Sequence, residues 1–278
     1  MIEKFFKTVC IIPQLIFNLD ETSTVFSEIN PSVVIPIHTS SSPIQPEPSL
    51  PRSTSIVFLT SSDGVRYLTP IIVPYSKIPE EFKEATTEME VYTPSENGHL
   101  SSTAFFDVFS KAILPSVLKI RIAIGKPHNH AVLIMGSGTG HFSPEMLRIC
   151  KDNLIDMIQR PSHTTHILQP NDQYVFANMK KCFRTGWKCG AVINAADRRK
   201  KFASLLKEAI AMASFPSTIK ASWKITGWQP FNPEVVLKII PDKPPEWSTT
   251  AFSRVRDAEN SRSGNIFFCS DDLSDLLK

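Results

Sequence analysis

The residues with the clearest potential for chemistry form a glycine-rich loop that follows an apolar run. The stretch HAVLIMGSGTGHFSPEML, from His130 to Leu147, predicts a strand, a tight turn and a helix with Pro144 in its first turn. Glycines at such a strand end allow the backbone to approach a ligand closely. Three interpretations follow for Gly136–Gly140: a nucleotide cradle, a catalytic loop without its acid, or a plain tight turn.

A nucleotide cradle at this place resembles the S-adenosylmethionine loop of methyltransferases, but two expected acids are absent. Such a loop carries an acid two residues before its first glycine, and this position is Ile134. A second acid should end the next strand, which instead ends in Gln159, Arg160 and Pro161. A P-loop fails because no Gly-Lys-Ser or Gly-Lys-Thr follows. A methyltransferase that uses Gly136–Gly140 stays an alternative, and binding of S-adenosylmethionine tests it.

The segments around the loop predict an α/β fold. An apolar run over Gln14–Thr22 predicts a strand, and two β-branched runs over Ser53–Tyr75 predict a hairpin in which Gly64 supplies the positive φ. Ser101–Leu118 has apolar residues at helical spacing behind a Ser/Thr cap. The strand–helix–strand pattern of 130–160 predicts a parallel βαβ unit. We therefore expect a mixed sheet flanked by helices, with further helices over 169–187 and 197–213.

Composition and charge allow several classes of protein. A chain of 278 residues with 42% hydrophobic content can bury a substantial core. The formal net charge of +3 permits nucleic-acid binding without requiring it. The five cysteines are an odd number with no CxxC pair, which predicts free thiols in a reducing compartment. Because no apolar run reaches membrane-spanning length and no signal-peptide cleavage site is present, we expect a soluble, intracellular protein.

Five sequence blocks occur in one order and together resemble the DDE endonuclease domain of pogo, Tigger, jerky and centromere-protein-B-like transposases. The segment PSHTTHILQPND, from Pro161 to Asp172, is the most specific part. The resemblance spans about Gln14 to Leu237 and is weakest between residues 31 and 100. The blocks are FNLDET, NGHLSSTAFFDVFSKAILPSV, HAVLIMGSGTGHFSPEML, IDMIQRPSHTTHILQPNDQYVFANMKK and GWQPFNPEVVL.

The resemblance implies an RNase H-like core in which three acids hold two divalent ions for phosphodiester cleavage and strand transfer. The first acid falls on Asp20 and the third on Asp172, which are the remnant catalytic and metal-binding residues. The second belongs directly after the strand, in a motif that ends in His141, and its position is Gly136. The glycine loop is then a catalytic loop that has lost its carboxylate. We therefore expect Mg²⁺ or Mn²⁺ binding to be weak or absent.

Neighbouring acids do not replace the missing carboxylate. Two dications about 3.5–4 Å apart repel by roughly 17 kcal/mol at an effective dielectric constant of ~20, so only concentrated carboxylates hold them. Glu21 faces away from Asp20 along the strand. Three other acids lie within or beyond the next helix: Glu145, Asp152 and Asp156. We expect cleavage and strand transfer to be lost; the alternative is an active Mg²⁺-dependent endonuclease that recruits an unusual third ligand near Gly136.

Histidines recur at two spacings that zinc sites also use, H-x-x-H and H-x-H. Zinc binding would need these side chains to converge with a cysteine, and the candidates are His128, His130, His163, His166 and Cys182. The resemblance implies a different role, because the segment with His163 and His166 leads into Asp172. We expect these two histidines and His141 to order the catalytic loops.

Basic residues outnumber acids by eight to one over residues 180–201. Lys181, Arg184 and Lys188 fall on one face of a predicted helix. Trp187 lies among them and either stacks on an exposed base or packs inside the protein. Such a patch predicts phosphate contacts that bind DNA without sequence readout; the alternative is a solvated helix face. The eight are Lys180, Lys181, Arg184, Lys188, Arg198, Arg199, Lys200 and Lys201.

The predicted organisation has three parts: an extension over 1–13, a DDE-like domain over 14–240 and a disordered Pro-rich linker with an acidic tail over 241–278. The domain contains a Pro/Ser-rich insertion at 31–52 in place of a basic segment of the family. We do not expect the helix-turn-helix modules that precede this domain in full-length relatives. The run DRRKK favours nuclear import. We expect a decayed or repurposed transposase fragment in the nucleus, with DNA as its partner, no membrane association, and a homodimer left open.

Overall fold

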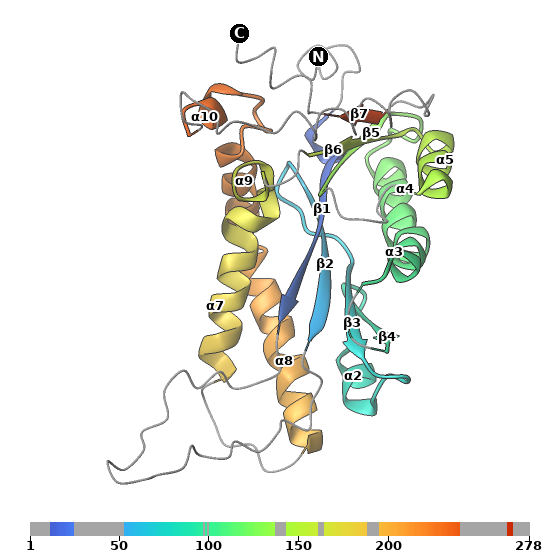
Figure 1. The fold of residues 1–278 in the computed structure, drawn as a ribbon, viewed down its shortest axis with the longest axis vertical. Coiled ribbons are helices and arrows are strands. Elements are labelled where there is room, and N and C mark those ends of the chain that lie inside the picture. The colour runs from blue at the N-terminus through green and yellow to red at the C-terminus, as the bar shows by residue number, and fades with distance from the viewer. Residues whose placement is uncertain are drawn as a thin grey trace, which may run out of the picture.

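Figure 1 shows the fold of the chain in a computed structural model. The predicted insertion at 31–52, residues 1–11 of the predicted extension and almost all of the predicted tail lie outside the described residues. Within the part that the structure describes, no helix is both long and apolar enough to cross a bilayer. The described residues are 12–24, 53–96, 98, 100–136, 143–160, 164–187, 195–239 and, for their backbone, 266–268.

A mixed seven-stranded sheet forms the centre of the fold, in the order β4-β3-β2-β1-β5-β6-β7. Strands β1, β2 and β3 are antiparallel neighbours, whereas β1, β5, β6 and β7 run parallel. This confirms the predicted hairpin, in which Gly64 has a φ of 99°. It also confirms the predicted parallel unit. The strands are β1 Ile16–Thr24, β2 Thr54–Ser61, β3 Thr69–Pro74, β4 Glu90–Ser95, β5 Ala131–Met135, β6 Ile155–Gln159 and β7 Ile266–Phe268.

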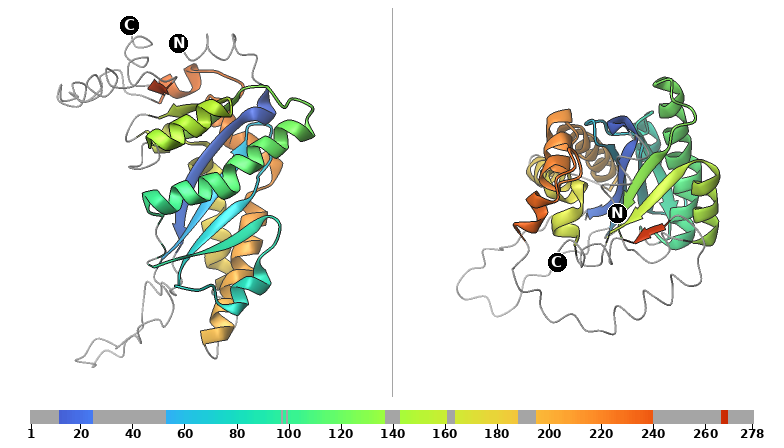
Figure 2. Two further views of the ribbon diagram at one scale, coloured as in Figure 1. Left: turned by 90° about the vertical axis from the view of Figure 1, so that its right-hand side faces the viewer. Right: turned by 90° about the horizontal axis from the view of Figure 1, so that it is seen from above.

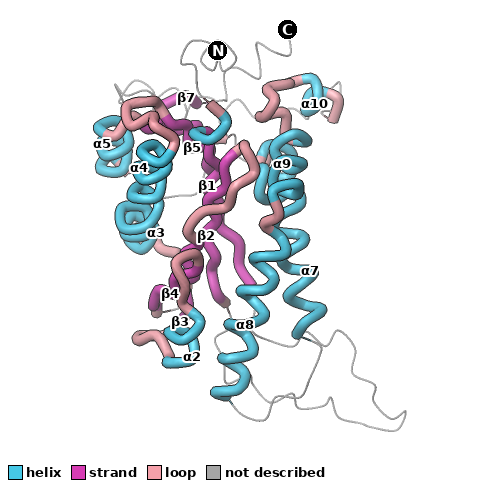
Figure 3. The backbone as a smooth tube through the Cα atoms, turned by 180° about the vertical axis from the view of Figure 1, so that it is seen from behind, coloured by secondary structure: helices cyan, strands magenta, loops and turns pink. Residues whose placement is uncertain are grey.

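Helices cover both faces of the sheet, as Figures 2 and 3 show. One face carries α3 Ser102–Val108, the π-helical turn η2 Phe109–Ile113, α4 Leu114–Ala123 and α5 Pro144–Asp152. The other carries η3 Asn171–Val175, α7 Phe176–Trp187, α8 Ala195–Ala213 and α9 Pro216–Ile225. The predicted cap is confirmed, because Ser101 accepts a hydrogen bond from the first turn of α3. Ser143 caps α5 in the same way. Shorter elements are η1 Pro13–Leu15, α2 Glu80–Ala85, α6 Thr165–Leu168 and α10 Glu234–Leu237.

Two hydrophobic cores lie on opposite faces of the sheet, and β1 contributes to both. Phe17 and Leu19 pack under α3, α4 and α5, whereas Ile16 packs with residues of α7, α8 and α9. Because side chains alternate along a strand, Asn18 and Asp20 share the face of Ile16. The polar side chains of β1 are therefore directed towards the start of α7.

Candidate functional site

Three residues of the candidate site lie in one row across the middle of the sheet. In the register of the three parallel strands, Asn18 pairs with Ile134, and Ile134 pairs with Ile158. Two positions further on, the same face carries Asp20, Gly136 and Arg160. The backbone N–H of Arg160 still donates to the carbonyl of Met135, at 3.1 Å, so the strands stay paired up to this row. These three side-chain positions are therefore cross-strand neighbours.

The Arg160 side chain lies against the place where a side chain at position 136 would project. A Cβ added to Gly136 would come within 3.3 Å of Nη2 of Arg160. Arg160 is only 3% exposed, so its guanidinium is buried in the site. Its charge acts on both Asp20 and Asp172. At the position where the resemblance expects an acid, the protein therefore presents a cation.

Asp172 is held over the strands by a chain of buried amide hydrogen bonds. The Asn18 amide donates to the carbonyl of Ile134 at 3.0 Å, and its oxygen accepts from the backbone N–H of Asn171 at 3.1 Å. The Thr60 hydroxyl donates to the Asn171 side-chain oxygen at 2.7 Å. Asp172 follows in the π-helical turn η3, a distortion that recurs at functional sites. These bonds fix the acid that the third position of the family pattern requires.

We expect Asn18→Ala to lower the free energy of unfolding by about 1–3 kcal/mol, because it removes a fully buried amide and leaves the N–H of Asn171 without that acceptor. Urea unfolding followed by circular dichroism measures the loss. Asn178→Ala, at an exposed position of α7, is the matched control and should change stability by less than about 0.5 kcal/mol. Equal, small effects of both substitutions would contradict the role given to Asn18.

Burial favours protonation of both acids, and the charge of Asp172 adds to this effect at Asp20. Burial, and next the charge of Asp172, raise the pKa of Asp20 to about 8, while Gln169 and Arg160 act in the opposite direction. Burial also raises the pKa of Asp172, opposed first by Arg160 and then by Lys180. The pKa of Arg160 is lowered by burial and raised again by both acids. The two carboxyl groups thus share one buried guanidinium.

The residues present do not fit a pair of divalent ions. Oδ2 of Asp20 is buried without a hydrogen-bond partner among the described residues, which would suit a cation. Nε and Nη1 of Arg160 are buried without a partner in the same way, and N–H donors disfavour a metal ion at that point. Nowhere in the described ranges do three or more potential metal-ligating side chains gather. Asp20 and Asp172 without a third carboxylate therefore leave a two-metal site incomplete.

The other acids considered as replacements lie elsewhere. Glu145 is exposed in the first turn of α5, and Glu21 is exposed on β1 next to Asp20. Asp152 is exposed at the end of α5. Asp156, at the start of β6, is 2.7 Å from Nδ1 of His130. Within the described residues, no acid takes the place of the missing one beside Gly136.

The predicted histidines do not form one cluster where they are described. His130 pairs with Asp156 at the opposite end of β5 from Gly136, whereas Cys182 is a free thiol on α7. His166 is exposed on α6, and its backbone carbonyl accepts from Nε2 of Gln173 at 2.9 Å. That bond links α6 to the turn with Asp172 through the backbone. His141, His163 and the loop residues 137–140 lie outside the described residues.

The basic residues predicted to bind nucleic acid separate into two groups. On α7, Lys181 and Arg184 are exposed and Lys180 is half-buried, with its charge acting on Asp172. Arg198 and Lys200 lie on α8, half-buried and exposed respectively. α7 ends at Trp187, far from the acids, and α8 begins below that end in Figure 1. Lys188 lies outside the described residues.

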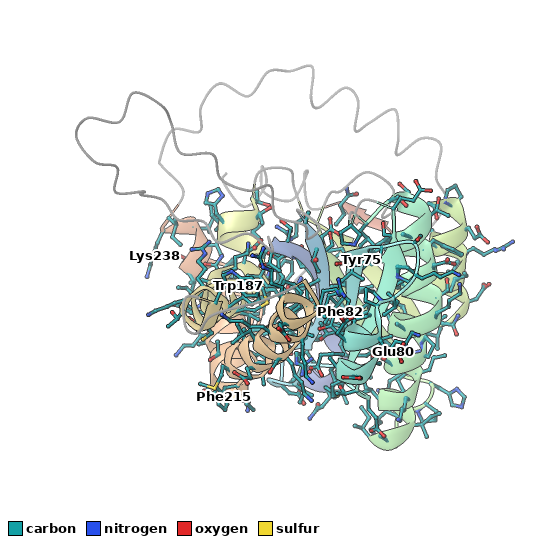
Figure 4. All side chains as sticks on the ribbon, turned by 90° about the horizontal axis from the view of Figure 1, so that it is seen from below. Tyr75, Glu80, Phe82, Trp187, Phe215 and Lys238 are labelled. Atoms are coloured by element: carbon teal, nitrogen blue, oxygen red, sulfur yellow. The ribbon has the colours of Figure 1, made fainter. Side chains whose placement is uncertain are left out.

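Two members of the α8 group are occupied by contacts within the protein. Arg199 binds the Glu81 carboxylate through Nε at 3.1 Å and Nη2 at 2.7 Å. Lys201 donates to the backbone carbonyl of Trp187 at 3.0 Å and lies over its ring. Trp187 itself is buried against Phe183 and faces the interior in Figure 4. Of the two roles considered for this tryptophan, the structure favours packing over base stacking.

The sequence interpretation missed Arg160, Asn18, Asn171 and Gln169 as parts of the site. Arg160 had a signal, because it lies two residues after Ile158 and so shares its face of the strand. Asn18 had one as well, as a polar residue within an apolar run. The contacts of Asn171 and Gln169 depend on how the start of α7 lies over the sheet, which local patterns do not contain.

Comparison with known proteins identifies the class of the fold first. The crystal structure of the Mos1 mariner paired end complex with Mn matches with a TM-score of 0.50 at 12% identity, over 84% of this chain and 59% of that chain. The fold is RNase H-like, as predicted. Residues 52–227 match the DDE superfamily endonuclease family, and the chain belongs to that family. The matched range includes Gly136, Arg160 and Asp172.

A human relative supports the same assignment. Tigger transposable element-derived protein 7 from Homo sapiens is 29% identical over 138 residues, which is 48% of this chain. The match covers 25% of that protein, so the chain spans only part of the length of the curated relative that it matches. The resemblance to the pogo and Tigger group is therefore confirmed.

Proposed function

We propose that this transposase-derived DDE domain binds DNA and does not cleave it. The observation that carries the proposal is the row Asp20, Gly136 and Arg160, in which the middle acid is absent and a buried cation lies next to its position. In-line phosphodiester cleavage by this fold depends on two metal ions held by clustered carboxylates. Without the third carboxylate, the chain keeps the scaffold but lacks the charge that would hold both ions.

Binding is assigned to the exposed basic side chains of α7. The buried residues of this helix face the core, and Lys181 and Arg184 are exposed. Both lie within about three and a half turns of Asp172 along the same helix, so they extend from the former catalytic face. Contacts of this kind neutralise phosphates and release counterions, which gives affinity without sequence readout. Arg198 and Lys200 extend the surface along α8. We also propose a nuclear location, because DNA is the proposed partner and the run DRRKK favours nuclear import.

The double substitution Lys181→Ala/Arg184→Ala is expected to weaken binding to a duplex of about 30 base pairs by tenfold or more at low salt. It should also reduce the slope of log K against log salt by about 2, since two phosphate contacts are lost. Fluorescence anisotropy over a salt series measures both. The matched control, Lys207→Ala/Lys224→Ala, removes two exposed charges from α8 and α9 and should have a much smaller effect.

The second half of the proposal is tested by nicking of supercoiled plasmid in Mg²⁺ or Mn²⁺. The native chain and Asp20→Ala should both leave the plasmid intact. Metal-dependent nicking by the native chain that Asp20→Ala abolishes would refute the loss of cleavage. If the native chain does not bind duplex DNA at low salt, the binding half is wrong.

A further inference from the structure

The guanidinium of Arg160 lies beside position 136, which has no side chain. Neighbouring strands lie about 4.8 Å apart, so Asp20 and Arg160 are two strand spacings from each other, with Gly136 between them. A side chain at position 136 would contact the long side chain that Arg160 extends from this row. The 3.3 Å approach of Nη2 to the projected Cβ of Gly136 places the guanidinium over this gap.

The two remaining carboxyl groups already have a buried cation. The charge of Arg160 acts on Asp20 and on Asp172, whereas that of Lys180 acts on Asp172. A divalent ion at this point would gain two carboxylates but would lie beside a buried guanidinium whose positive charge repels it.

We propose that the Arg160 guanidinium is the resident cation of the Asp20–Asp172 site and excludes divalent ions from it. Loss of the central acid and gain of this cation then form one change, in which the site has passed from metal ligation to two acids beside one buried guanidinium. A carboxylate restored at position 136 alone pairs with Arg160 rather than with a metal. Metal binding returns only when Arg160 is replaced as well.

The test is direct Mn²⁺ binding by the full chain, measured from the electron paramagnetic resonance signal of free Mn²⁺. The native chain and Gly136→Asp should bind no Mn²⁺ that depends on Asp20. The double variant Gly136→Asp/Arg160→Ala should bind at least about tenfold more tightly than Gly136→Asp, because the repelling charge is gone. Mn²⁺ should then raise the melting temperature of the double variant and leave that of the native chain unchanged.

Two control variants show whether the position of the positive charge, rather than the net charge of the site, decides metal binding. Gly136→Asp/Arg160→Lys keeps a cation on the same strand position and should bind as weakly as Gly136→Asp. Gly136→Asp/Lys180→Ala removes one positive charge near Asp172 but leaves Arg160, and should bind equally weakly. If the Lys180 variant binds as well as the Arg160→Ala variant, the guanidinium has no special place in the site and the proposal is wrong.

The proposal stays testable if the double variant does not fold. Asp20-dependent Mn²⁺ binding by the native chain, or tight binding by Gly136→Asp alone, would overturn it without any substitution of Arg160. The inference rests on the loss of cleavage proposed above, yet different results would contradict the two proposals. Plasmid nicking by the native chain would refute the proposed function, whereas Mn²⁺ binding without nicking would refute only the assignment of Arg160 as the resident cation.

Discussion

The protein is expected to lose stability as the pH rises from about 4 to about 8, opposite to the usual effect of ion-paired carboxylates. Burial and the neighbouring Asp172 raise the pKa of Asp20 from 3.8 to about 8 in the folded chain. The folded state therefore holds a proton that the unfolded state has already released, and each unit of pH in this window disfavours folding. Below both pKa values, that of the unfolded and that of the folded chain, the contribution of Asp20 to stability does not change with pH. Above both, Asp20 is ionised in both states and the full cost of the buried charge lowers stability. Burial raises the pKa of Asp172 as well, which acts in the same direction.

The size of this effect is on the order of a few kcal/mol between pH 5 and pH 8.5. Urea unfolding at a series of pH values measures it. Asp20→Asn, which is neutral at every pH, should flatten the profile and make the protein more stable than the native chain at alkaline pH. Asp152→Asn neutralises an exposed carboxylate on α5 and is the matched control. A native profile that rises between pH 5 and 8 would contradict the buried, protonated state of Asp20.

Most elements near the glycine loop were predictable because their signals are local. The apolar run before Gly136 and the Pro144 start of α5 lie close together in the chain, and the structure confirms both. The elements missed include β4, α2, α6, α9 and α10. Strand β4 contains Pro94 and is only partly buried, so its apolar pattern is weak. It is recognisable as a strand mainly through its parallel pairing with β3.

The sequence supplied a hypothesis for the two acids of the candidate site and none for the buried cation beside Gly136. Asp20 and Asp172 came from the family pattern, and that pattern has no position for an arginine. The role of Arg160 needs the register of three strands together with the absence of a side chain at Gly136. The same limit applies to the basic run, since counting charges does not show that Arg199 is paired with Glu81. Partners distant in sequence decide which charges face solvent.

Phe202→Ala is expected to lower the free energy of unfolding by about 3–5 kcal/mol. This ring is fully buried on α8 and joins three other aromatic rings. Its centroid lies 5.2 Å from that of Phe183, 6.1 Å from that of Phe82 and 6.3 Å from that of Trp187, each in an edge-to-face arrangement. The cluster therefore connects α2, α7 and α8. Truncation would leave a cavity between all three helices and remove the edge-to-face contacts together.

Phe202→Leu keeps most of the side-chain volume and should lower the free energy of unfolding by only about 1–2 kcal/mol. Comparison of the two variants therefore separates the loss of packing from an unspecific effect of substitution. Urea unfolding followed by tryptophan fluorescence suits this measurement because Trp187 is part of the cluster. The result also bears on DNA binding, since α7 and α8 carry the basic side chains assigned to it. A loss below about 1 kcal/mol for Phe202→Ala would mean that this cluster does not hold the two helices together. The packing role of Trp187 would then lose its support, and base stacking by that ring would have to be reconsidered.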